Sequence, residues 1–313
     1  TLEPELKFAL ASRNGIALPY ATPEEVRASY SFTDLGTFLD AYYEGMSVLL
    51  TEADFYDLAM AYFTKAASDK VRWVEMFFDP QAHTSRGVSF DTVISGLRRA
   101  QSDADRTLGV RSALIMCFLR DFTPEFAMAT LLESLPYKPW ILGVGLDSNE
   151  FENPPAKFAA VFERARREGY RLTMHCDVDQ VGSIEHIRQV IFDIGVHRID
   201  HGTNIVEDAS LVAAAKGKGL GFTCCPVSNT WVSESSKSHL IRQLLDEGVK
   251  VTINSDDPAY FGAYINANLQ LMADEQNLSA DAVVQLVRNA FEVSWAPAPL
   301  RYEFLAEVDA TQK

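Results

Sequence analysis

Two histidines and two adjacent aspartates are the residues of this chain most suited to chemistry. His175, His201 and the pair Asp256-Asp257 each come directly after, or at the end of, a short run of apolar and β-branched residues. Neutral imidazole and carboxylate are good zinc ligands, and zinc brings a bound water molecule close to a neutral pKa. A second histidine or aspartate beside the metal orients that water or moves its proton. These residue types predict metal-assisted hydrolysis.

The elements that must position these residues alternate along the chain. Short strand-like runs are separated by longer segments with apolar residues at i, i+3 and i+4, such as Phe90–Arg99, Lys157–Arg167 and Asp208–Lys216. Strands separated by helices are typical of parallel β-α-β units. Seven strand-like runs occur, at Val71–Phe77, Ala113–Leu119, Ile141–Leu146, Arg171–His175, Arg198–His201, Gly221–Cys225 and Val249–Asn254.

Such a long series of units predicts a (β/α)8 TIM barrel with extra helices, in which the active site lies at the carboxyl ends of the strands. His175, His201 and Asp256-Asp257 would then meet at one rim. No linker, repeat or low-complexity stretch divides the chain, so we expect a single domain over residues 1–313. A TIM barrel has eight strands, and residues 1–68 are helical in pattern. We therefore expect the first strand to precede Thr1.

The balance of charge limits the partners of this protein. The chain has 28 basic and 43 acidic residues and a net charge of −15, which disfavours nucleic acid and suits a small neutral or cationic substrate. We predict a cytoplasmic protein without a membrane partner, because no signal peptide and no apolar run near 18 residues occurs. The sequence allows a homo-oligomer. The four cysteines form no C-x-x-C pair and are expected to be buried reduced thiols: Cys117, Cys176, Cys224 and Cys225.

The motifs around these residues resemble those of the adenosine/adenine deaminase family, within the metal-dependent hydrolase superfamily. The resemblance runs over nearly the whole chain, and the segments Phe77–His83 and Gly145–Ser148 resemble the adenine deaminase branch. It implies zinc-dependent hydrolytic deamination of an aminopurine, with adenine as the expected substrate and adenosine or an N6-substituted adenine such as a cytokinin as alternatives. The matching motifs are Thr173-Met174-His175, Arg198-Ile199-Asp200-His201-Gly202, Cys225-Pro226-Val227-Ser228-Asn229 and Asn254-Ser255-Asp256-Asp257-Pro258.

The resemblance implies a role for each matching position. His175 and Asp256 would be ligands of one zinc ion, and Asp256 would also help to deprotonate the water. His201 would contact the attacking hydroxide and stabilise its charge. Asp257 would hydrogen-bond a purine ring nitrogen, N7, and the substrate-binding positions Asp147 and Ser148 would lie near the purine edge.

The sequence departs from the family pattern at the zinc ligands. The family has a His-x-His motif that supplies two more of them, and this chain has none. The segment Thr1–Leu6 resembles the residues that follow that motif in relatives, so two further histidine ligands are expected in residues that precede Thr1.

A second departure concerns the proton donor. Relatives read His-Ala-Gly-Glu where this chain reads His175-Cys176-Asp177-Val178, and valine cannot transfer a proton. We expect Asp179 to protonate the purine ring, with Asp177 as the alternative; both could instead be loop carboxylates without that role. Two other hypotheses stay open, which are deamination of a pyrimidine or pteridine and a non-catalytic relative that binds purines.

Overall fold

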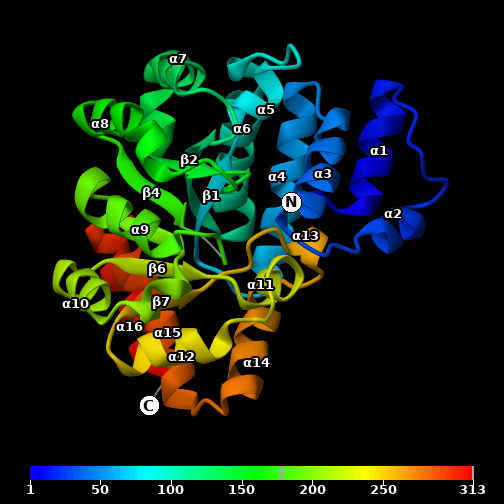
Figure 1. Ribbon diagram of the computed structural model, residues 1–313. Helices are drawn as coiled ribbons and strands as arrows, with labels where there is room; N and C mark the ends of the chain where they lie inside the picture. Colours follow the sequence, from blue (N-terminus) through cyan, green and yellow to red (C-terminus); the bar gives the residue numbers. More distant parts are fainter. Residues whose placement is uncertain (177–178, 312–313) are drawn as a thin grey trace.

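The centre of the computed structural model, which describes residues 1–176 and 179–311, is one sheet of seven parallel strands. The strands follow each other in chain order, and helices surround the sheet (Figure 1). This arrangement confirms the predicted β-α-β series and the barrel-type fold. The strands are β1 (Trp73–Phe78), β2 (Arg111–Leu119), β3 (Ile141–Asp147), β4 (Arg171–Cys176), β5 (Arg198–His201), β6 (Gly221–Cys224) and β7 (Lys250–Ile253).

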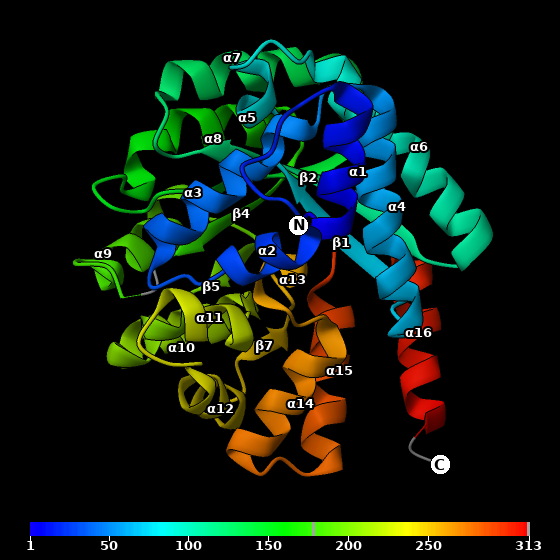
Figure 2. The same ribbon diagram turned by 90° about the vertical axis from the view of Figure 1, so that its right-hand side faces the viewer.

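The first 68 residues are mainly helical, as their sequence predicts, and form α1 to α4 together on one side of the sheet (Figure 2). Capping residues mark where several helices begin. The Thr22 side chain accepts a hydrogen bond from the Glu25 backbone N–H, and Thr123 does the same for Phe126. These helices are α1 (Pro4–Asn14), α2 (Pro23–Ser29), α3 (Leu35–Gly45), η1 (Met46–Val48) and α4 (Glu52–Ser68).

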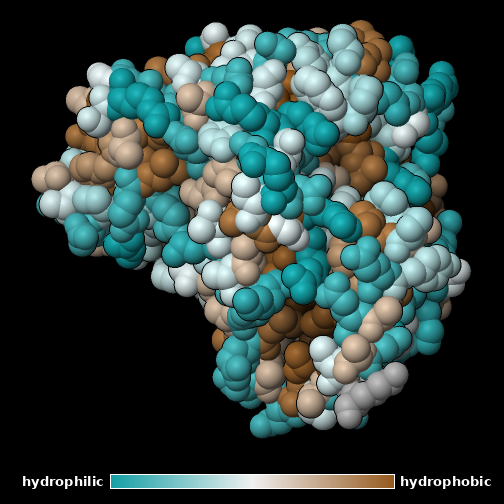
Figure 3. Space-filling model, turned by 180° about the vertical axis from the view of Figure 1, so that it is seen from behind, coloured by the Kyte–Doolittle hydropathy of each residue, from teal (hydrophilic) through white to brown (hydrophobic). Residues whose placement is uncertain are grey.

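The remaining helices connect the strands or follow the last one. They are α5 (Pro80–Thr84), α6 (Phe90–Leu108), α7 (Pro124–Ser134), η2 (Leu135–Trp140), η3 (Pro155–Phe158), α8 (Ala159–Arg167), α9 (Ser183–Arg188), η4 (Gln189–Ile194), η5 (Thr203–Glu207), α10 (Ala209–Lys218), α11 (Pro226–Val232), α12 (Ser238–Asp246), α13 (Pro258–Phe261), α14 (Ile265–Gln276), α15 (Ala280–Val293) and α16 (Ala298–Thr311). Figure 3 shows the face of the molecule opposite to the view of Figure 1. Most of this face is hydrophilic, and hydrophobic side chains line a recess low in its centre. Among the described residues, no helix combines the length and the apolar character that a membrane span needs.

The register of the sheet brings the chemically important strand ends together. His175 pairs with Asp200, and Cys176 pairs with His201, so the ends of β4 and β5 lie side by side. Asp147 is the last residue of β3, and Asp79 comes directly after β1. Because all seven strands are parallel, their carboxyl ends form one rim.

An ion pair inside the curve of the sheet joins strands that are not neighbours. Glu75 of β1 pairs with Arg198 of β5, and the two side chains are only 7% and 6% exposed. The Glu75 carboxylate also accepts hydrogen bonds from the Trp295 backbone N–H at 2.6 Å and the Trp73 indole N–H at 2.8 Å. The Arg198 guanidinium lies 4.3 Å from the centre of the Trp295 ring. Three strands separate β1 from β5, so the pair forms only because the sheet curls.

This pair gives a prediction about stability. Glu75→Gln keeps the hydrogen-bond acceptor but leaves the Arg198 charge buried without a counter-ion, so the free energy of unfolding should fall by about 3 kcal/mol in urea titrations. Glu307→Gln is the matched control, because its ion pair with Arg72 is half exposed and should contribute little. Equal effects of the two substitutions would contradict this role.

Candidate active site

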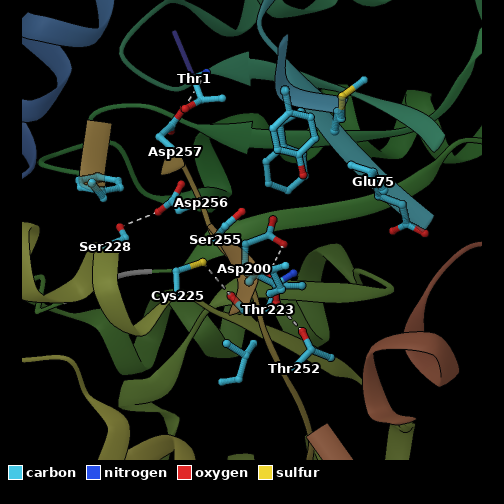
Figure 4. Close-up of a pocket in the computed structure, with 18 of the residues that line it drawn as sticks. Thr1, Glu75, Asp200, Thr223, Cys225, Ser228, Thr252, Ser255, Asp256 and Asp257 are labelled. Carbon is cyan, nitrogen blue, oxygen red and sulfur yellow. Dashed lines mark hydrogen bonds and ion pairs between the residues drawn. The ribbon is translucent and has the colours of Figure 1, made fainter. Parts of the chain in front are cut away.

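A cavity of about 560 Å³ extends along the sheet from the start of β1, at Trp73, to the rim at the carboxyl ends of the strands. A cavity of this size can enclose a small heterocycle. Figure 4 shows Asp256, Asp257 and Cys225 among the side chains that surround it. Six residues singled out in the sequence line this cavity together: His175, His201, Asp256, Asp257, Asp147 and Ser148.

His201 and Asp256 form the centre of the site. The His201 Nε2 and Asp256 Oδ2 atoms are 3.9 Å apart, and the Cys225 sulfur lies with them in a group whose ligand atoms are all within 4.8 Å. Both residues have left-handed backbone, with φ of 61° for His201 and 54° for Asp256. Such conformations are unfavourable for residues other than glycine and cluster at functional sites.

His175 lies beside this centre and has the protonation state that a metal needs. Its ring centre is 5.1 Å from that of His201. Burial lowers the pKa of His175 to about 4, so the imidazole is neutral at pH 7. The Nδ1 atoms of both rings are buried without a hydrogen-bond partner among the described residues. A neutral imidazole at His175, a second imidazole at His201 and a neighbouring carboxylate are a donor set that fits zinc.

Asp256 is the carboxylate of this set. Loss of water around the side chain raises the pKa of Asp256, whereas a nearby cation would favour its charged form. Ser228 of α11 points at it and donates a hydrogen bond of 2.6 Å from Oγ to Asp256 Oδ2 (Figure 4). Ser228 therefore fixes the orientation of the carboxylate.

Asp200 lies next to His175 inside the sheet. It was not assigned a role from the sequence. Its carboxylate accepts hydrogen bonds from Thr173 at 2.8 Å and Thr223 at 2.7 Å, one from each neighbouring strand. Its Oδ2 lies 3.5 Å from Nδ1 of His175. The position of Asp200 within the motif Arg198–Gly202 was visible in the sequence, but its partners come from two other strands. Cys225 was expected to be a buried thiol, and its free sulfur at the centre of the site was likewise not anticipated.

The opposite side of the cavity is built by β3 and the N-terminal helix α3. Asp147 is the last residue of β3, and Ser148 follows it. Tyr43 of α3 donates a hydrogen bond of 2.6 Å to Ser148 Oγ. Asp257, which follows Asp256 directly in the chain, lines the same cavity. The structure thus places three expected substrate-binding residues around one space.

Asp179 is placed differently from the other candidates. Its side chain lines a second, smaller pocket with Ser183 and Asn204, and among the described residues it is not part of the main cavity wall. Lys237 Nζ lies 2.6 Å from Asp179 Oδ1, and both residues have left-handed backbone. Its role as proton donor stays a prediction. Asp177, the alternative donor, lies outside the described residues.

Comparison with known proteins agrees with this geometry. Residues 1–311 match the model of the family described as adenosine deaminase. The chain belongs to this family. It is 51% identical over 311 residues to an uncharacterized deaminase of Schizosaccharomyces pombe, covering 99% of this chain and 92% of the relative. An adenine deaminase of Sphingopyxis alaskensis is 47% identical over 312 residues, covering 99% and 91%. As a member of this family, the protein is a deaminase, a hydrolase that acts on C–N bonds.

Solved structures show the same fold. The crystal structure of an adenine deaminase from Arthrobacter aurescens superposes with a TM-score of 0.95 at 39% identity, covering 99% of this chain and 95% of that one. An amidohydrolase from Burkholderia ambifaria with bound zinc gives a TM-score of 0.88 at 24% identity, covering 99% and 87%. This deaminase therefore has the TIM-barrel fold of its relatives.

The hydrogen bond from Ser228 gives a prediction about catalysis. Ser228→Ala removes the hydrogen bond to the Asp256 carboxylate. The loss of a hydrogen bond to a charged group should reduce kcat/KM for ammonia release by about tenfold. Thr230→Ala on the same helix is the control, because the Thr230 hydroxyl is exposed and bonds only to the Val227 carbonyl among the described residues. Unchanged kinetics in Ser228→Ala would show that Asp256 is oriented by other groups.

Proposed function

We propose that this deaminase converts adenine to hypoxanthine and ammonia with the help of one zinc ion. The observation that carries the proposal is the meeting of His175, His201 and Asp256 at the rim of a cavity large enough for a purine. Relatives named adenine deaminase at 39% and 47% identity, covering nearly the whole chain, support the choice of substrate. We also propose a cytoplasmic location, which is supported by four cysteines that are buried free thiols.

His175 and Asp256 would hold the zinc ion, with two further histidines expected from the family pattern. Zinc, when bound, supplies Lewis-acid activation of a water molecule. His201 would orient the attacking water and stabilise the negative charge that develops on the oxygen of that water. The His201 Nε2 and Asp256 Oδ2 atoms are 3.9 Å apart, so both groups can contact the same water molecule. Asp256 would receive the proton of that water.

The purine would be oriented by the aspartates of the rim. Asp257 would hydrogen-bond N7, and Asp147 and Ser148 would contact the purine edge on the other side of the cavity. Water adds to C6, the ring nitrogen N1 takes one proton, and the amino group leaves as ammonia after gaining another. An N6-substituted adenine would follow the same course and release an amine. The loop after β4, which departs from the family pattern, favours testing that second substrate class.

Activity on a panel of aminopurines tests this proposal. We expect ammonia release from adenine to be fastest, compared with adenosine and N6-isopentenyladenine, by a coupled ammonia assay. Asp256→Ala should lose both turnover and the roughly one zinc per chain that metal analysis should find in the parent protein. Parent protein that binds purines with neither zinc nor turnover would support a non-catalytic relative, and full activity in Asp256→Ala would overturn the site.

The proton donor has a test of its own, because Asp179 is paired with Lys237. Asp179→Asn should lower kcat by about 10²-fold if this carboxyl group protonates the ring. Lys237→Met breaks the same ion pair but keeps the acid, so its rate should stay within a few-fold of the parent. A near-normal rate in Asp179→Asn would reject the assignment. Equal losses in both variants would show that the ion pair matters for the loop and that Asp179 is not the donor.

A further inference from the structure

The ladder of the sheet is shortest between β3 and β4, the two strands that carry Asp147 and His175. Among the described residues, this ladder consists of two residue pairs and ends at Val144 and Leu172, whereas β1 with β2 and β2 with β3 form six pairs each. Asp147 and His175 each lie three residues beyond the last pair. The ladder therefore does not fix the proposed zinc ligand relative to the proposed purine-binding residue.

Arg120 spans the unpaired ends of these two strands. It follows β2 directly, and its side chain is fully buried. The Nη1 atom of Arg120 donates a hydrogen bond of 3.0 Å to the backbone carbonyl of His175, and Nε donates one of 3.0 Å to the carbonyl of Asn153 in the loop after β3. The backbone N–H of Arg120 donates to the Asp147 carbonyl at 3.1 Å. One residue thus binds the end of β3, the loop after it and the end of β4.

The loop after β3 is held firmly enough to support this connection. Lys157 Nζ donates to the Arg120 carbonyl at 2.9 Å and to Asn153 Oδ1 at 2.7 Å, so a second cation holds the two residues together. Ser148 and Glu152 of this loop have left-handed backbone, with φ of 74° and 58°. Such conformations persist only where the surrounding structure fixes them.

Packing alone does not explain an arginine at this position. A buried guanidinium loses its hydration, and the counter-ion of this one is Glu150, which lies 3.5 Å from Nη1 and is 6% exposed. The Nη2 atom of Arg120 is buried without a hydrogen-bond partner among the described residues. An apolar side chain of similar volume would fill the space without these losses. Arginine differs from such a side chain because its planar fork fixes two acceptors relative to each other.

We propose that Arg120 is a positioning residue that holds His175 in place relative to Asp147 and Ser148 across the unpaired ends of β3 and β4. This inference rests on the proposed function, in which His175 is a zinc ligand and the other two residues contact the purine. Arg120 is not among the residues that line the described cavity, so it acts through the backbone of His175 and touches neither metal nor substrate.

Arg120→Lys tests this role, because lysine keeps the positive charge but replaces the planar fork with a single nitrogen. The kcat for ammonia release should fall by about 10²-fold, which is the effect expected when a reacting group moves by about 1 Å. The dissociation constant for zinc, measured by competition with a chelator, should rise by about tenfold, because Arg120 orients a metal ligand. A melting temperature shows that the variant is folded.

Arg166→Lys is the matched control. The Arg166 guanidinium also donates to two backbone carbonyls, those of Ile194 and Gly195, but these residues precede β5 and lie near the amino ends of the strands. We expect the kcat and the zinc affinity of Arg166→Lys to stay within a few-fold of the parent values. Equal losses in the two variants would indicate a general effect on folding and would contradict the proposed role of Arg120.

Amide hydrogen exchange tests the connection without zinc or turnover. Exchange at residues 146–153 and 173–176 should be about tenfold faster in Arg120→Lys than in the parent, whereas Arg166→Lys should change only the region around Gly195. A parent protein without zinc or ammonia release would contradict the proposed function, and the exchange rates would still decide the role of Arg120. Parent-like exchange in folded Arg120→Lys, or parent-like kcat and zinc affinity, would overturn the inference.

Discussion

A buried charge pair sets the shape on which this site depends. Glu75 and Arg198 are far apart in the order of the strands, and their contact requires the sheet to curl until β1 faces β5. The pair is anchored by Trp295, which donates its backbone N–H to Glu75 and stacks its ring on Arg198. The segment after α15 is thereby tied to the interior of the sheet. Removing one partner of a buried ion pair is costly, so the contact of Glu75 with Arg198 is retained only in a curled sheet.

Curvature converts a row of strand ends into a ring of functional groups. A flat parallel sheet would place Asp79 and Asp256 at opposite edges, whereas the curled sheet places both on one cavity. The ring then has two sides with different character. The neutral His175 and the Asp256 carboxylate on the β4–β7 side suit a cation, whereas two neighbouring carboxyl groups, those of Asp79 and Asp147, line the β1–β3 side. A flat heterocycle between them would meet a different chemistry at each end.

The sequence predicted most of the framework because the framework is local. All seven strands begin and end within two residues of the predicted runs. The largest differences are at β1, which begins two residues later, and at β2, which begins two residues earlier. The positions of His175, His201 and Asp256 followed from the parallel arrangement, which the alternation of strands and helices indicated. Family resemblance added their roles, which stay predictions, and the structure places the three residues on one cavity.

Contacts between segments that are far apart in the chain could not be predicted from the sequence pattern. Asp200 is held by threonines 27 and 23 residues away, and Asp179 is paired with a lysine 58 residues away. Asp79 was visible only as part of a family-like motif, because its partnership with Asp147 depends on the spacing of β1, β2 and β3. No periodicity encodes such pairs. They arise when the sheet has curled and the side chains compete for the same small volume.

The left-handed backbone at His201, Asp256 and Ser148 has a consequence for how this protein can evolve. Each of these residues holds a conformation that costs on the order of 1 kcal/mol and that glycine adopts freely. Selection for thermal resistance alone would favour glycine or asparagine at all three positions. The side chains present at these three positions are not the ones that backbone stability favours, as is expected where turnover and stability oppose each other. The rim is therefore the part of the molecule where laboratory evolution toward a more heat-stable protein would first erode catalysis.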